Sequence, residues 1–327
     1  MLAPLDPAAV AVAGALLARR GLRVERGGGA SAATLEQRSV LARIVVLNLL
    51  VSRALSWPSI VLFARSLVAC VPGAMCAFGV LNATPSLALA LVLAKVASLA
   101  ALAAAALVAR AQRFAPPATL DRALARTALA ACLLAAVDAA LDVAFVFVDR
   151  PLAEVACCVT LRDLGAPAAA GPLDWRWRRA LPLPSMAIYL GTALLALLAF
   201  RLAAGPAGAA VRTRRVGLAT VAGMAMLFAG LLAAIDALSP VVLHRPHHHC
   251  AVEVWTEPLD GPAMLGLLLC GALLPASTLL LCWSGSGGAA RAAVSRVAGE
   301  SLRVASWSSA GVMVMFAAHL VVARFHA

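Results

Sequence analysis

The chain has 327 residues, of which 63% are hydrophobic and only 13% are charged, and its mean hydropathy is +0.94. Because soluble domains carry about 25% charged residues, this composition excludes an ordinary soluble globular protein. The formal net charge of +12 comes from arginines spread over many connections, which excludes a folded basic domain that binds nucleic acid. We therefore expect an all-α integral membrane protein with the lipid bilayer as its main partner.

Seven apolar segments reach the length of about 20 residues that a helix needs to cross a hydrocarbon core of about 30 Å. Their leucine, alanine and valine content favours helices, because every backbone amide in lipid must bond within its own segment. The sequence thus predicts a polytopic bundle of about seven transmembrane helices. The expected spans are 44–69, 79–109, 124–148, 183–203, 216–243, 262–282 and 304–323.

We expect residues 1–43 to form a cytoplasmic N-terminal segment and residues 44–327 to form a single transmembrane domain. The apolar run 8–18 is short for a span, so it predicts a short interfacial helix, with an extra span as the alternative. No basic residue precedes this run, which argues against a cleaved signal peptide.

The basic residues are distributed unevenly between alternate connections. The N-terminal segment and the connections after the second, fourth and sixth spans hold 17 lysines and arginines, whereas the opposite face holds 7. The positive-inside rule places the first face in the cytoplasm, with the N-terminus inside and the C-terminus exoplasmic. The only lysine is Lys95 and alanine is abundant, which is typical of a GC-rich bacterial genome. We therefore expect a multi-pass protein of the bacterial inner membrane.

The three exoplasmic connections, residues 70–78, 149–182 and 244–261, all carry cysteine or histidine. The candidate metal ligands are Cys70, Cys76, Cys157, Cys158, His247, His248, His249 and Cys250. Thiolate and imidazole groups bind copper(I), zinc and other thiophilic metals. The pattern predicts one exoplasmic metal site, copper first and zinc or mercury next, provided that the three connections converge.

Two alternatives use the same cysteines differently. In the first, Cys70 with Cys76 and Cys157 with Cys158 exchange electrons, and the protein is a membrane thiol–disulfide oxidoreductase. In the second, the cysteines form structural disulfides in the oxidising exoplasmic space, within a non-catalytic subunit of a transporter or respiratory complex. Five exoplasmic cysteines cannot all pair with one another, which counts against a purely structural role.

Ionisable residues within the expected spans are the second functional signal. Asp138 and Asp142 share a face of the third span, Asp236 lies in the fifth, and Arg53 and Lys95 lie in the first two. Charges at membrane depth usually mark an ion path, a proton relay or an internal ion pair. The aspartates therefore predict either an inward path for a cation or pairing with Lys95 or Arg53 that stabilises the bundle.

The leading hypothesis is an inner-membrane protein that captures or passes a thiophilic metal ion. The sequence contains no nucleotide-binding loop, so ATP-driven transport would require a separate energy-coupling protein. A periplasmic metal carrier is the other partner that we expect.

The predicted topology places Cys250 outside the cell. A membrane-impermeant thiol reagent should label Cys250 in intact cells, because the third exoplasmic connection would be open to the medium. Mass spectrometry of the modified peptide measures the labelling. Modification of Cys250 only after the cells are permeabilised would show that the sidedness is wrong.

Overall fold

A computed structural model of the chain describes residues 32–72, 74, 76–115, 119–148, 183–206, 210–242, 252–284, 288 and 290–325. These described residues are almost entirely helical and contain no strand. The elements are α2 (Ala32–Ser66), η1 (Val68–Cys70), α3 (Ala77–Asn82), α4 (Pro85–Ala111), α5 (Asp121–Phe147), α7 (Leu183–Ala204), α8 (Thr213–Ala233), η2 (Ala234–Leu238), α9 (Ser239–Val242), α10 (Glu253–Thr256), α11 (Gly261–Ser284) and α12 (Arg291–Phe325).

Seven of the described helices are long and apolar enough to cross a membrane, which confirms the expected set of long apolar segments and is consistent with a multi-pass membrane protein. Three boundaries differ from expectation. The first long helix begins at Ala32, within the expected N-terminal segment 1–43 and well before the expected start at residue 44. The segment expected over 79–109 is divided, because α3 ends at Asn82 and α4 begins at Pro85, whose missing N–H suits the first helical turn. The last helix begins at Arg291, well before residue 304, since polar residues can extend a helix beyond the bilayer.

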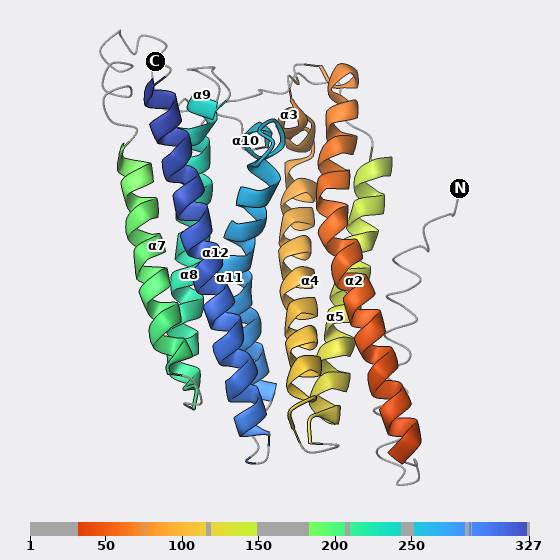
Figure 1. Cartoon of the computed structure of the whole chain (residues 1–327). Helices are drawn as coiled ribbons and strands as arrows, with labels where there is room; N and C mark the ends of the chain where they lie inside the picture. Colours follow the sequence, from red (N-terminus) through yellow and green to blue (C-terminus); the bar gives the residue numbers. More distant parts are fainter. Residues whose placement is uncertain are drawn as a thin grey trace.

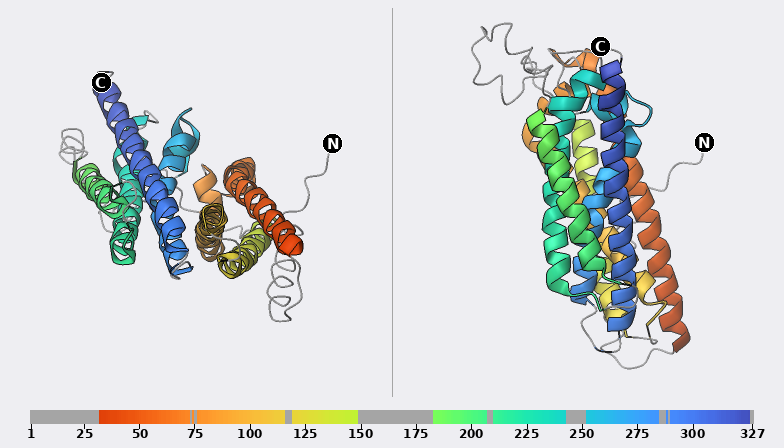
Figure 2. Two further views of the ribbon diagram at one scale, coloured as in Figure 1. Left: turned by 60° about the horizontal axis from the view of Figure 1, so that its bottom comes forward. Right: turned by 60° about the vertical axis from the view of Figure 1, so that its left-hand side comes forward.

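The long helices form two groups that lie side by side (Figures 1 and 2). Helices α2, α4 and α5 pack on one another in the first group, and α7, α8, α11 and α12 pack together in the second. Helix α4 joins the groups through its contacts with α11 and α12. At this junction Ser277 of α11 donates a hydrogen bond of 3.0 Å to the carbonyl oxygen of Ala100 in α4.

The two ends of the bundle carry different residues. Helices α3, α9 and α10 and the last turns of α12 lie at one end (Figure 1), which we call the cysteine end because Cys70 and Cys76 lie there. The helices that border the three predicted exoplasmic connections all end or begin at the cysteine end. We call the opposite end the arginine end. There Gln112 links α2 to α5, because it accepts a hydrogen bond from Arg43 of α2 and donates one to Asp121 of α5. Which end faces the cytoplasm stays a prediction from the arginine count.

The outward faces of the long helices are apolar. Leu47 and Leu62 of α2 and Leu195 of α7 are each at least 60% exposed, and many similar side chains surround them. Such a surface would be unfavourable in water, whereas hydrocarbon chains in a bilayer solvate it.

Small residues allow the helices of the second group to approach closely. A Cβ atom at Gly223 of α8 would lie 3.2 Å from the carbonyl oxygen of Gly271 in α11 and 3.3 Å from the ring of Phe200. By contrast, a Cβ atom added at Gly217, about two turns earlier in the same helix, would have no heavy atom within 4 Å. The backbones of α8 and α11 therefore meet at Gly223.

We predict that Gly223→Val lowers the free energy of unfolding by about 1–3 kcal/mol, because the added methyl groups overlap the α11 backbone. Thermal unfolding of the purified protein in detergent measures the effect. The matched control is Gly217→Val, which carries the same change in helix propensity and should have a much smaller effect. Equal losses in the two variants would contradict close packing at Gly223.

Candidate functional site

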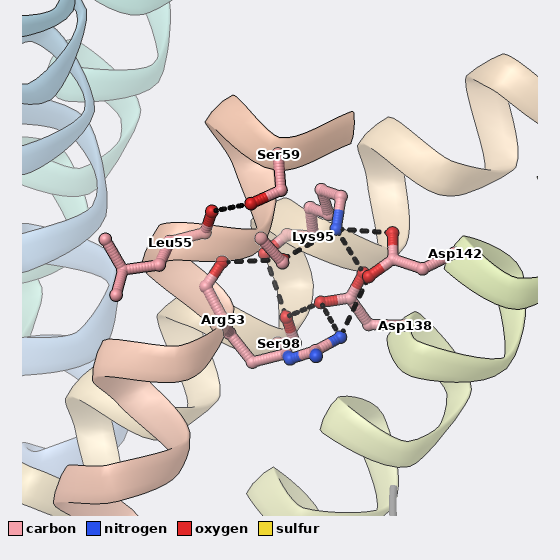
Figure 3. Close-up of polar contacts among 8 residues, drawn as sticks. Arg53, Leu55, Ser59, Lys95, Ser98, Asp138 and Asp142 are labelled. Carbon is pink, nitrogen blue, oxygen red and sulfur yellow. Dashed lines mark hydrogen bonds and ion pairs between the residues drawn. The ribbon is translucent and has the colours of Figure 1, made fainter. Parts of the chain in front are cut away.

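Four charged side chains meet inside the first group of helices. We call Arg53 of α2, Lys95 of α4, and Asp138 and Asp142 of α5 the charge quartet (Figure 3). Three of the four side chains are at most 4% exposed, and that of Asp142 is 15% exposed. Asp138 and Asp142 lie one helical turn apart, so both carboxylates project from one face of α5.

Lys95 is at the centre of the quartet. Its Nζ atom lies 3.1 Å from Oδ1 of Asp138 and 2.7 Å from Oδ1 of Asp142. The third contact of Nζ is a hydrogen bond of 2.9 Å to Oγ of Ser56, one turn beyond Arg53 in α2. Lys95 therefore donates hydrogen bonds to Asp138 and Ser56 and forms an ion pair with Asp142.

Arg53 closes the quartet from the side of α2. Its Nη1 atom donates a hydrogen bond of 3.0 Å to Oδ2 of Asp142 and lies 3.6 Å from Oδ2 of Asp138. Its Nε atom is buried and has no hydrogen-bond partner. Two cations thus face two carboxylates, and the buried site is electrically neutral when all four groups are ionised.

Ser98 supports the carboxylate of Asp138. Its hydroxyl lies 3.0 Å from Oδ2 of Asp138 and 3.0 Å from the backbone carbonyl oxygen of Lys95. A single hydroxyl proton can satisfy only one of these two acceptors at a time. The hydroxyl therefore donates to either the carboxylate or the backbone carbonyl oxygen.

The structure confirms that Arg53 and Lys95 pair with Asp138 and Asp142, one of the two roles that the sequence allowed. The two serines could have been found from sequence, because Ser56 and Ser98 each follow a buried cation by three residues on the same helical face. The sequence does not show that α2 and α4 both place these faces against α5. An ion path through the aspartates stays a prediction.

Asp236 lies apart from the quartet. It is exposed and belongs to η2, a π-helical turn that continues α8 in the second group. This turn packs on α7, α8, α9, α10 and α12, whereas α5 packs on α2 and α4. The structure therefore brings together two of the three aspartates that we assigned to a path.

The predicted metal ligands are only partly described. Cys70 is exposed at the end of η1, Cys76 is buried at the start of α3, and no disulfide joins them. Within the described part of the chain, no three histidine, cysteine, aspartate or glutamate side chains form a metal-binding group. The remaining predicted ligands, Cys157, Cys158, His247, His248, His249 and Cys250, lie outside the described residues.

Comparison with known proteins found no family model, no curated protein and no solved structure that matches the chain. The function of the site is therefore inferred from its own geometry and chemistry.

We predict that Lys95→Met destabilises the protein by about 3–5 kcal/mol, because Arg53 then faces two carboxylates and one buried negative charge is not compensated. The double variant Lys95→Met/Asp138→Leu removes one charge of each sign, so its loss of stability should be smaller than that of Lys95→Met alone. Thermal or denaturant unfolding in detergent measures both variants.

The control is Arg110→Met, which breaks the exposed pair between Arg110 and Glu300 and should change stability by less than about 1 kcal/mol. A double variant that loses as much stability as Lys95→Met, or more, would show that Lys95 and Asp138 do not stabilise each other.

Proposed function

We propose that the protein is a membrane transporter in which the charge quartet takes up and releases a proton during the transport cycle. The observation that carries the proposal is a neutral cluster of four ionisable groups enclosed by α2, α4 and α5. Ionisable groups at membrane depth are costly, and in membrane proteins they commonly form proton relays or substrate sites.

The chemistry of the quartet favours a proton over a metal ion at this position. Two cations already occupy the space between Asp138 and Asp142, so a metal ion there would meet like charges. A proton instead joins a carboxylate covalently and removes its charge. Thiophilic metals also prefer sulfur and nitrogen ligands to carboxylates.

Asp142 is the carboxylate that takes up the proton in this proposal. Its side chain is the most exposed of the quartet at 15%, and it contacts both Arg53 and Lys95. Protonation of Asp142 weakens both ion pairs, which loosens the contact of α5 with α2 and α4. Release of the proton on the other side of the membrane restores the pairs and the packing.

The cargo that we propose is a thiophilic metal ion, copper first and zinc or mercury next, captured at the cysteine end. Support comes from the exposed thiol of Cys70 and from the helices that border all three cysteine- and histidine-bearing connections, which meet this end. The membrane is that of a bacterial cell, with the cysteine end outward. A proton gradient would supply energy for transport, with a separate energy-coupling protein as the alternative source.

Liposomes that contain the purified chain and a trapped pH indicator test this proposal. After copper(I) or zinc is added outside, the wild type should accumulate metal, and the internal pH should change with it. Asp142→Asn should reduce both signals to the level of empty liposomes, because its side chain cannot be ionised. Elemental analysis measures the metal, and Cys250→Ser should lower its uptake.

Glu300→Gln is the control, since Glu300 is a partly exposed carboxylate at the arginine end and lies outside the quartet. Metal uptake that is equal in the wild type and Asp142→Asn would exclude a role for the quartet. A pH change without metal uptake would exclude the proposed cargo, and the absence of both signals in folded protein would exclude the proposal as a whole.

A further inference from the structure

Arginines gather around the last turn of α7 at the arginine end. Nε of Arg201 donates a hydrogen bond of 2.9 Å to Oγ of Ser306 in α12, and its guanidinium carbon lies 5.1 Å above the ring of Trp307. The serine and the indole hold the guanidinium on two sides. This arrangement orients the side chain where α7 packs on α12.

Two further arginines approach the same turn. Nη1 of Arg215 in α8 donates a hydrogen bond of 3.4 Å to the carbonyl oxygen of Leu202. A Cβ atom at Gly299 of α12 would lie 3.5 Å from the carbonyl oxygen of Ala204 and 4.0 Å from Nη2 of Arg303. The guanidinium of Arg303 therefore also lies close to the end of α7.

This arginine group, Arg201, Arg215 and Arg303, has no carboxylate partner in the described part of the chain. The end of a helix supplies only about half a negative charge, which is small against three positive charges. The buried quartet is neutral, and Arg110 and Arg296 share Glu300 at the same end of the bundle. The arginine group is thus a cationic site that lacks its anion.

The surface beside the arginine group is apolar and contains an aromatic residue. Leu194, Leu198 and Leu202 follow one another at four-residue intervals along α7 and are 50–68% exposed. Trp307 of α12 is 66% exposed, as is common for indoles at a membrane interface. A cationic group at the end of an apolar helical stripe matches the charged head and the hydrocarbon tail of a lipid.

We propose that the surface where α7 and α12 meet binds an anionic phospholipid, with its phosphate at the arginine group and its acyl chains along the leucine stripe. Charge complementarity selects the anionic headgroup, because the positive charge of a zwitterionic headgroup would be repelled by Arg201 and Arg303. Basic sites between transmembrane helices commonly hold such headgroups. This inference is independent of the proposed transport function.

Quenching of tryptophan fluorescence by brominated lipids tests the inference, since Trp307 reports on its own site. The full chain is placed in phosphatidylcholine vesicles that contain either brominated phosphatidylglycerol or brominated phosphatidylcholine. The contribution of Trp307 is the difference between the wild type and Trp307→Phe. Brominated phosphatidylglycerol should quench this contribution more strongly at equal lipid content.

Arg201→Gln and Arg303→Gln should each lower the preference for phosphatidylglycerol about fivefold, the effect expected of one arginine near an anionic headgroup. Arg201→Lys keeps the charge and should retain most of the preference. Arg126→Gln is the matched control, because Arg126 is an exposed arginine of α5 near the arginine end and belongs to neither α7 nor α12. Gel filtration and thermal unfolding identify variants that fail to fold.

Equal quenching of Trp307 by the two brominated lipids would overturn the proposal. An unchanged preference in folded Arg201→Gln and Arg303→Gln would overturn it as well. A loss of the same size in Arg126→Gln would show general attraction to the arginine end and no specific site where α7 and α12 meet.

Discussion

The need to neutralise charge away from water is the constraint on which the first group of helices depends. An ion moved from water into a protein interior loses several kcal/mol of solvation even after relaxation. The chain offsets this cost by placing each of two cations within 3.6 Å of both carboxylates. Each cation contacts both carboxylates, so these contacts fix the rotation and the relative height of α2, α4 and α5.

Close packing of apolar side chains, rather than ion pairs, stabilises the second group of helices. Its core is formed by apolar side chains such as Tyr189, Phe200 and Phe316, and its backbones approach closely at glycine. Dispersion contacts of this kind are the main attraction between helices in lipid, which is as apolar as the side chains themselves. A charge network thus orders one half of the molecule and close packing orders the other, and α4 touches both halves.

Several parts of this arrangement could be predicted from the residues. The lengths of the apolar runs predicted seven long helices, and the intramembrane position of Lys95 predicted an aspartate partner. Which of Asp138, Asp142 and Asp236 pairs with Lys95 could not be predicted. Hydropathy places all three at similar depth and says nothing about which helices are neighbours. The break before α4 was missed, although Pro85 is a direct signal for it.

The sequence by itself determined the number and type of the long apolar helices, because runs of this length and composition favour helices that could cross a bilayer. It also determined the ionic character of the interior, because charged residues in such segments require partners. Only the tertiary structure decided which charges meet and which arginines of the described residues stay without a carboxylate. These outcomes depend on the rotation and neighbours of each helix, which are set by packing between side chains far apart in the chain.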